Sequence, residues 1–393
     1  MNPQRQWLTM FRREAAASMV AQRVPPSPDG SKSPTCAERT SGQLASQPLA
    51  IDIAGFANVH PDTPPLAFQP VWYRAWEAKL HEQACRASGH RSWMLSRFGG
   101  SAARELSTAD CQPAFHAVAA ASSHALHQFR SQAGRRVEHK RQALIFFDYW
   151  GRTSHLEPTS SRRDVFNLDI IPEFLLQRHG IGGFSCKLRA QRSAVPEAIQ
   201  LATDLLCGSE IDLVLIGGLY RCPPMLAFSA VTEEIAAERS WLGKRAMQRS
   251  PLIECAGFCV VTRHTPADGF AAADSMNVSQ LRFVQLPARR KPAIAALRAA
   301  WSAKLSGERA LIYGGMRPSQ LLAGIERQAA EGIAHASYEN ICQQFGDSGG
   351  LNPLLALERF AQLRLDRSAS TTRTVGLISV TDASGGTWIL HCQ

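Results

Sequence analysis

Residues 183–218 read GFSCKLRAQRSAVPEAIQLATDLLCGSEIDLVLIGG, and this stretch decides the fold class. Residues 183–189 are predicted to form a strand, and Ser193 is suitably placed to cap the helix that follows. We expect that helix to end at Gly208, because glycine is the usual helix stop. Residues 212–216 form a short apolar run typical of a buried strand. A strand, a helix and a second strand in this order predict a parallel β-α-β unit and therefore an α/β fold.

Elements of the same kinds flank this unit on both sides. Upstream, the sequence predicts strands at residues 50–56 and 143–147 and a helix at 114–132. Downstream it predicts strands at 258–261, 281–284, 310–313, 375–380 and 387–390, and helices at 292–305, 319–331 and 354–363. The ordered body is therefore expected to comprise two similar α/β halves, at residues 48–235 and 236–393.

Residues 1–47 differ from this body in composition. They are basic and rich in Pro and Ser, as in the run from Arg23 to Gly30. Such a segment buries too little apolar surface to offset the entropy lost on ordering, so we expect a disordered tail. No run of 18 apolar residues occurs in the chain, which argues against a membrane-spanning helix.

The charge is strongly positive, at +10, and 36 of the 43 basic residues are Arg. Arg favours phosphate and carboxylate partners, so an acidic carrier protein or a coenzyme phosphate would fit this charge. Neither a zinc-finger spacing nor an aromatic-basic platform accompanies the Arg residues, so nucleic acid is not expected as a partner.

The ten cysteines include no Cys-x-x-Cys pair. No matching His pair accompanies Cys255 and Cys259, so we expect no metal site. Ten thiols without a secretion signal favour a reducing, cytoplasmic environment.

Four segments together resemble the thiolase fold, and within it the ketoacyl synthase III-type condensing enzymes. They are residues 183–218, Glu254 to Val260, Ile312 to Pro318, and Phe345 to Gly350. The resemblance covers about residues 49–393. It implies a thiolase-like α/β fold, in which two similar halves with mixed five-stranded sheets pack around buried helices.

The chemistry of that family requires a Cys at the start of a buried helix, with a His and an Asn on loops of the second half. In this sequence the Cys position falls at Gln191 or Arg192, the His position at Gly314 and the Asn position at Asp347. None of these residues supplies the family's chemistry. The resemblance therefore implies a non-catalytic, ketoacyl synthase-like subunit of fatty-acyl or polyketide-type biosynthesis, most consistent with a specialised metabolite.

Cys186 leaves an alternative open. If a short insertion follows it, Cys186 would occupy the nucleophile position, and Asp347 would act beside it as an orienting group or base. The chain would then be an acyltransferase or 3-oxoacyl carrier-protein synthase that takes an acyl group from acyl-coenzyme A or an acyl carrier protein. Without an insertion, Cys186 lies within a strand as a buried thiol. A binding or scaffold protein that uses only the fold is a third reading.

The resemblance also implies partners. Members of this family dimerise through a strand near the nucleophile, here residues 183–189. We therefore expect a homodimer, or a heterodimer with a condensing-enzyme paralogue, and an acyl carrier protein or acyl-coenzyme A as the further partner. No cofactor is implied.

Overall fold

The computed structural model of the chain describes residues 47–67, 79, 82–83, 85–86, 93–99, 112–133, 141–149, 170–188, 192–222, 224–242, 250–264, 276–303, 305, 309–366 and 374–393. The predicted tail, except for Gln47, lies outside the described residues, and so does Gln191.

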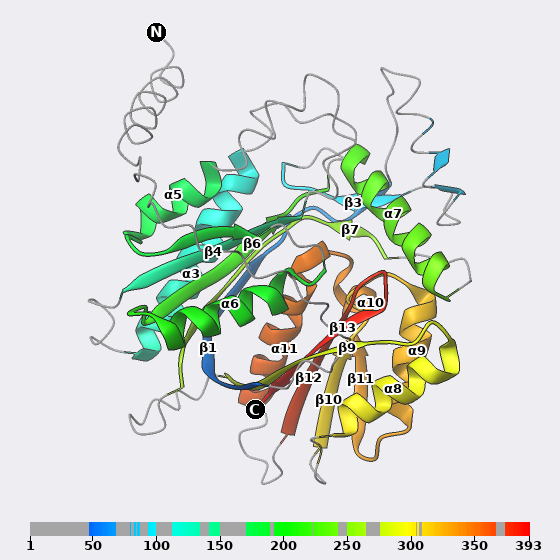
Figure 1. The fold of residues 1–393 in the computed structure, drawn as a ribbon. Coiled ribbons are helices and arrows are strands. Elements are labelled where there is room, and N and C mark those ends of the chain that lie inside the picture. Colours follow the sequence, from blue (N-terminus) through cyan, green and yellow to red (C-terminus); the bar gives the residue numbers. More distant parts are fainter. Residues whose placement is uncertain are drawn as a thin grey trace, which may run out of the picture. The chain divides into compact units, whose positions relative to one another are not determined.

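Five strands of the first half pair side by side (Figure 1). In chain order they are β1 (Gln47–Val59), β4 (Gln142–Tyr149), β5 (Ser185–Leu188), β6 (Leu213–Tyr220) and β8 (Cys255–Arg263). Their spatial order is β5-β4-β6-β8-β1, and β8 runs antiparallel to both of its neighbours. If these five strands are numbered 1 to 5 in chain order, their spatial order is 3-2-4-5-1.

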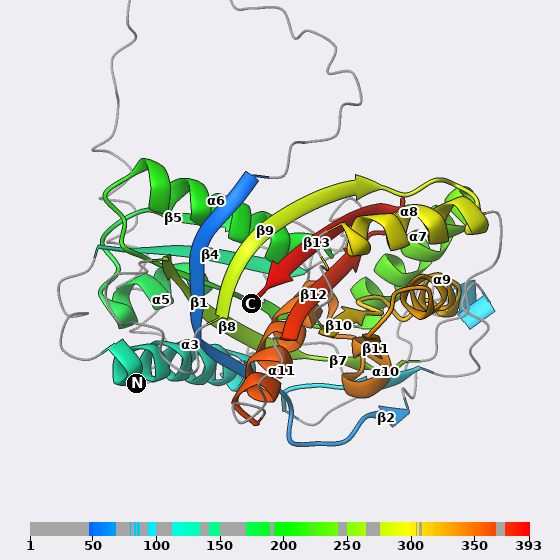
Figure 2. The same cartoon turned by 90° about the horizontal axis from the view of Figure 1, so that it is seen from below.

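The second half repeats this arrangement. Its strands are β9 (Met276–Gln285), β10 (Arg309–Gly314), β11 (Ala336–Asn340), β12 (Thr374–Thr381) and β13 (Gly386–Cys392). Their spatial order is β11-β10-β12-β13-β9, with β13 antiparallel to both neighbours, so the order and the directions match those of the first set. β1 and β9 pair antiparallel and join the two sets into one curved ten-stranded sheet (Figure 2). The predicted pair of similar halves is confirmed.

Helices occupy equivalent places in the two halves. α6 (Ala194–Gly208) connects the third and fourth strands of the first set, and α11 (Asn352–Asp366) does the same in the second set after the short 3-10 turn η6 (Gly349–Leu351). On the opposite face of the sheet, α3 (Gln112–Ala133) and α5 (Ile170–His179) cover the first set. α8 (Arg290–Ser302) and α9 (Gln320–Glu331) cover the second set on that face.

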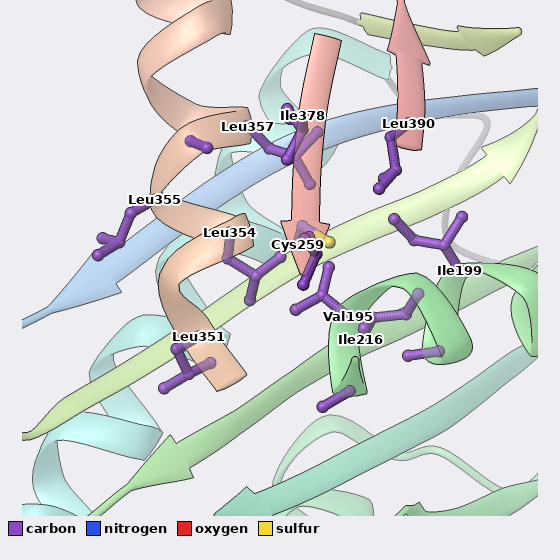
Figure 3. Close-up of a cluster of buried hydrophobic side chains, with 14 of the residues drawn as sticks. Val195, Ile199, Ile216, Cys259, Leu351, Leu354, Leu355, Leu357, Ile378 and Leu390 are labelled. Carbon is purple, nitrogen blue, oxygen red and sulfur yellow. The ribbon is translucent and has the colours of Figure 1, made fainter. Parts of the chain in front are cut away.

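Alternate side chains of β6 pack into different hydrophobic cores, one on each face of the sheet. Val214 and Ile216 point to the face that carries α6 and α11, whereas Leu213 and Leu215 point to the face covered by α3. Figure 3 shows Val195 and Ile199 of α6 and leucines of α11 gathered between the strands. Each fully buried Leu or Ile contributes about 1.5–3 kcal/mol, so this inner layer is a large part of the stabilising energy.

The other described elements lie around the ends of the sheet. They are α7 (Pro224–Leu242), α10 (Ile341–Phe345) and a small sheet of β2 (Leu66–Ala67), β3 (Met94–Ser96) and β7 (Leu252–Ile253). Residue 235, chosen from the sequence as the end of the first half, lies inside α7. β8 pairs within the first set and ends at Arg263, and the first strand of the second set begins at Met276. Searched over the described residues, the helices include none with the length and apolarity needed to cross a membrane.

Candidate functional site

The two inner helices begin at neighbouring points of the molecule. Arg192 and Ser193 lead directly into α6, and the glycine loop of residues 346–351 leads into α11. A group of buried polar side chains joins these two helix starts. We call this group, Arg192, Glu234, Arg317, Asp347 and Asn352, the helix junction.

Arg192 and Asp347 form the centre of the helix junction. The Nη1 atom of Arg192 donates a short hydrogen bond to Oδ1 of Asp347, and its Nη2 atom donates to Oδ2 at 2.9 Å. This is the bidentate geometry in which a guanidinium and a carboxylate interact most strongly. Both residues are buried, with 2% and 0% of their surface exposed. The pair therefore links the start of α6 to the glycine loop without water between them.

Further hydrogen bonds hold the Asp347 carboxylate in place. The backbone N–H of Gly349 donates to Oδ1 at 3.0 Å, and the Asn352 amide donates to the same oxygen at 3.2 Å. The Asn352 amide also donates to the carbonyl oxygen of Met316 at 3.0 Å. The Asp347 backbone pairs with the strand end at Pro251 and Ile253. Asp347 is consequently fixed from both its main chain and its side chain.

Helix α7 contributes two more carboxylates to this region. Arg192 donates from Nε and Nη2 to the two oxygens of Glu234, at 2.8 and 3.0 Å. One turn further along α7, Glu238 accepts hydrogen bonds from Arg317 and, at 2.5 Å, from the hydroxyl of Ser319. Residues four apart in a helix share one face, so α7 directs both carboxylates inward. Arg317 also lies 3.9 Å from Glu234. Buried opposite charges therefore alternate from Asp347 through Arg192, Glu234 and Arg317 to Glu238.

This series of buried ion pairs costs free energy to form, and breaking it also costs free energy. Burying each ion costs several kcal/mol in lost hydration, and only well-formed partner contacts offset that cost. Removing one partner from a buried pair destabilises proteins by about 3–5 kcal/mol because a charge is left uncompensated. The helix junction is therefore a specific arrangement that each of its members helps to maintain.

Gly314, which ends β10, has no room for a side chain. A Cβ atom there would lie 2.7 Å from Oε2 of Glu326 and 2.7 Å from Cε2 of Tyr338. Glu326 accepts hydrogen bonds from the Gly315 N–H at 2.7 Å and from the Tyr338 hydroxyl at 2.8 Å. Burial raises the pKa of Glu326 to about 7, with these hydrogen bonds and Arg317 opposing the rise. A carboxyl group and an aromatic ring thus occupy the space beside Gly314.

Cys186 lies in the middle of β5, where it pairs with Ile145 of β4 at the end of the sheet. Burial raises the pKa of its thiol. Asp347 is not among the groups that affect the pKa of Cys186. It does contribute to the raised pKa values of two other thiols, Cys222 and Cys342, for which burial is the largest cause. The structure therefore brings Arg192 to Asp347 and leaves Cys186 in the strand.

Cys342 is the thiol in contact with the helix junction. The Asn352 amide donates to its sulfur at 3.2 Å, and Cys342 is 1% exposed. Burial, followed by the negative charge of Asp347, raises its pKa well above the ordinary value. A thiol held protonated in this way is a poor nucleophile.

Glu254 forms a second buried cluster beside the helix junction. It accepts from the backbone N–H groups of Phe98 and Cys222, at 2.9 and 3.1 Å, and lies within 3.5 Å of Arg97 and Arg221. These contacts tie the ends of β3 and β6 to the start of β8. Across the described part of the chain, no group of three or more His, Cys, Asp or Glu side chains has the arrangement of a metal site.

No protein-family model and no curated protein matches the sequence. A chain of AntDE:AntF, a type II polyketide synthase acyl carrier protein in complex with its ketosynthase, matches with a TM-score of 0.59 at 12% identity, over 88% of this chain and 99% of that one. The chain has the thiolase fold. The OzmH KS7 ketosynthase domain from Streptomyces albus JA3453 matches with a TM-score of 0.58 at 12% identity, over 88% of this chain and 74% of that domain.

A third thiolase-fold match is a variant of OleA from Xanthomonas campestris, with a TM-score of 0.50 and 12% identity, over 88% of this chain and 99% of that one. At such identities the likeness concerns the fold. It agrees with the resemblance drawn from the sequence.

Within the thiolase fold, the positions singled out in the sequence have distinct surroundings. Arg192 contacts Asp347, Gly314 adjoins Glu326, and Cys186 lies in the strand β5. A guanidinium remains protonated at all ordinary pH values, so Arg192 serves neither as a nucleophile nor as a general base. The groups that meet at the helix junction are suited to holding two helices together.

Sequence reasoning missed several members of this site. The sequence alone does not single out Glu234, Glu238, Ser319 or Glu326, and it presents Cys342 only as one of ten thiols. One signal was available for the glutamates: two carboxylates spaced four apart in a segment that also carries buried Ile235 and Trp241. Such spacing is typical of an inward-facing charged pair as well as of a solvated face.

Proposed function

We propose that this chain is a non-catalytic thiolase-fold subunit that pairs with an active condensing enzyme in fatty-acyl or polyketide-type biosynthesis, consistent with a specialised metabolite. The main observation in support of the proposal is the buried Arg192–Asp347 pair. By the resemblance, Arg192 lies at or next to the position of the nucleophile, and Asp347 lies at the position of the Asn. The crowded surroundings of Gly314, at the His position, give further support.

The edge of the sheet supports a partner subunit. β5 is the last strand at its end, so one side of its backbone has no neighbouring strand among the described residues. Phe184, next to it, is 40% exposed. A free edge beside an exposed aromatic side chain suits the addition of a partner's strand. We propose that a condensing-enzyme paralogue, or a second copy of this chain, pairs along β5.

The competing function is acyl transfer through Cys186. It requires the thiol at the start of α6 with Asp347 beside it. Asp347 instead binds Arg192, and burial raises the pKa of Cys186, which lowers its thiolate fraction. These observations favour the non-catalytic function, and they leave the reaction itself to be tested directly.

The direct test of catalysis is acyl loading. The purified chain is incubated with acyl-coenzyme A and, separately, with an acyl carrier protein, and the intact mass is measured. We expect no acyl adduct. An adduct on Cys186, located by peptide mass spectrometry and abolished by Cys186→Ala, would establish the acyltransferase function and contradict ours.

The test of the partner is purification from the native host. We expect a thiolase-fold paralogue to copurify and Phe184→Glu to weaken that association, because it adds a charge at the proposed interface. Phe345→Glu is the matched control, since Phe345 is 37% exposed and lies at the end of α10. A homodimer with measurable condensing activity would rule the proposal out. A monomer that loads no acyl group would favour the scaffold reading.

A further inference from the structure

Cys186 lies on the strand at one end of the ten-stranded sheet (Figure 2). It is a free, partly buried thiol. Among the residues that the structure describes, its strand β5 has a neighbouring strand, β4, on one side only. The backbone of β5 therefore determines which residue of an added strand would lie opposite this thiol.

The main-chain groups of β5 point alternately to its two sides. The N–H of Leu144 on β4 donates to the carbonyl oxygen of Phe184 at 3.0 Å, and Leu144 is the register partner of Ser185. In a parallel pair, a residue that faces the other strand bonds to the residues before and after its register partner, so Phe184 and Cys186 face β4. The N–H and C=O groups of Ser185 and Lys187 consequently point to the open side.

These directions restrict how an antiparallel second copy of β5 can pair. Outward-facing residues must lie opposite one another, so the twofold axis passes through a residue and not between two. An axis at Cys186 or at Lys187 keeps most of the strand within the new ladder. An axis at Lys187 sets two like charges directly opposite each other, which is destabilising. An axis at Cys186 sets Ser185 opposite Lys187 and is the favoured register.

The side chains of the strand agree with this register. Phe184, Cys186 and Leu188 share one face, because side chains alternate along a strand. Cys186 and Leu188 pack against the core that surrounds α6, and Phe184 is exposed. With the axis at Cys186, Phe184 of each copy lies opposite Leu188 of the other, so apolar groups meet across the axis. The edge is therefore self-complementary, and a second copy of this chain fits it.

The favoured register also sets the two Cys186 thiols opposite each other. They form a pair that is not hydrogen-bonded, in which Cα atoms are about 4.5 Å apart. Disulfides span Cα separations of about 4.4–6.8 Å, so the two thiols are within reach of a bridge. Burial raises the pKa of Cys186, which makes its sulfur a poor leaving group and slows the reduction of a bridge once it has formed.

We propose that two copies of this chain pair along β5 with Cys186 at the twofold axis, and that oxidation joins the two Cys186 thiols in a disulfide. Pairing along β5 rests on the proposed function, whereas the disulfide and its register rest on the backbone directions of β4 and β5. While the bridge is intact, β5 is occupied and unavailable to a condensing-enzyme paralogue. The bridge therefore makes partner choice sensitive to oxidation.

The oxidant is a small disulfide such as oxidised glutathione. The Cys186 thiolate of one copy attacks it, which forms a mixed disulfide and releases one glutathione thiol. The Cys186 thiolate of the second copy then attacks the Cys186 sulfur of the mixed disulfide and releases the second glutathione thiol. In total, two protein thiols are oxidised to one disulfide, and one glutathione disulfide is reduced to two thiols.

The test incubates the purified full chain with oxidised glutathione and measures the covalent dimer on a non-reducing gel. We expect a dimer that dithiothreitol reverses and in which peptide mass spectrometry finds Cys186 linked to Cys186. Cys186→Ser and Cys186→Ala should each give at least about tenfold less dimer, because the bridging sulfur is gone. Cys207→Ser removes the exposed thiol at the end of α6 and is the matched control, which should behave as the wild type.

Moving the thiol by one residue tests the register. Two variants combine Cys186→Ser with Ser185→Cys or with Lys187→Cys. In the favoured register each moved thiol is diagonal to its counterpart, with Cα atoms about 7–8 Å apart, beyond the limit of about 7 Å for a disulfide. Both variants should therefore give at least about tenfold less dimer than the wild type.

Three outcomes would overturn this inference: no covalent dimer of the wild type, an undiminished dimer of Cys186→Ser, or a moved thiol that bridges as efficiently as Cys186. The outcome is separable from that of the proposed function. A Cys186 bridge in a chain without a condensing-enzyme partner would leave the disulfide standing and reject the subunit role. A copurifying partner and a wild type that forms no bridge would do the reverse.

Discussion

Arg192 and Asp347 lie 155 positions apart in the sequence, yet a bidentate pair of hydrogen bonds joins them at the starts of the two inner helices. The duplicated strand order explains their meeting, because α6 and α11 follow equivalent strands of the two halves. Glu234 on α7 binds the other side of the same guanidinium. The contact therefore stabilises the relative position of the two halves.

Asp347→Ala should destabilise the chain by about 3–5 kcal/mol, because it leaves the Arg192 guanidinium partly uncompensated in a buried site. Urea unfolding followed by circular dichroism would measure the change as a lower midpoint. Replacing both partners, with Arg192→Met and Asp347→Leu, should cost less than the sum of the two single changes, since neither member of the pair is then left as a buried charge without the other. Glu234 loses Arg192 in this double variant just as it does in Arg192→Met alone.

The exposed pair between Arg141 and Glu210 is the control for this experiment. Both side chains are largely exposed, at 57% and 83%. Glu210→Ala should change the unfolding free energy by no more than about 1 kcal/mol. If Asp347→Ala had an equally small effect, the helix junction would not stabilise the relative position of the two halves.

Much of the fold was predictable because its signals are local. The apolar runs of β4, β6 and β10 each consist of a few consecutive residues, and the glycine that ends α6 comes shortly before β6, so the sequence predicts the β-α-β unit directly. β11 was missed since its sequence, Ala336 to Asn340, is a polar edge strand without an apolar run. α7 was missed because its inward face carries Glu234 and Glu238, which interrupt the apolar stripe expected of a packed helix.

For the candidate site, the sequence predicts which positions matter but not the contacts between them. The sequence indicated that Arg192, Gly314 and Asp347 replace the expected groups, but not that Arg192 and Asp347 bind each other. That contact depends on how two halves pack, which no local pattern encodes. The partners of Arg192 are 42 and 155 positions away, so neither spacing nor periodicity could reveal them.

Gly314→Ala should destabilise the chain by about 1–3 kcal/mol, as overpacking of a buried site does. The added Cβ would lie 2.7 Å from both Glu326 and Tyr338. Gly182→Ala is the matched control, because no atom lies within 4 Å of its Cβ position. Thermal unfolding of the two variants would measure the difference, and equal melting temperatures would show that the space beside Gly314 is not filled as described.

Glu326 should make the stability depend on pH between about 4.5 and 7. Burial raises its pKa from the ordinary 4.5 to about 7, so in this range the folded chain holds a proton that the unfolded chain releases. Stability from this group is therefore complete below pH 4.5 and falls as the pH rises to 7, by about 3 kcal/mol in total. Urea midpoints measured at several pH values would detect this slope.

Glu326→Gln should flatten that slope, because the amide removes the charge and its oxygen still accepts from Gly315 and Tyr338. Glu331→Gln, at the exposed end of the same helix, should leave the slope unchanged. A wild-type slope that persists in Glu326→Gln would mean that another group carries the dependence.

The thiols should differ in their reaction with iodoacetamide in a way that tests the role of Cys186. Cys207 is exposed at the end of α6, whereas Cys186 is partly buried with a raised pKa. Since the thiolate is the reactive form, we expect native Cys207 to be modified at least about tenfold faster than Cys186, and Cys222 and Cys342 to react only after unfolding. Peptide mass spectrometry over a time course would measure each rate, and the rates should converge in concentrated urea, which serves as the control. A Cys186 that reacts faster than Cys207 in the folded chain would be an activated nucleophile, and the non-catalytic function would then have to be given up.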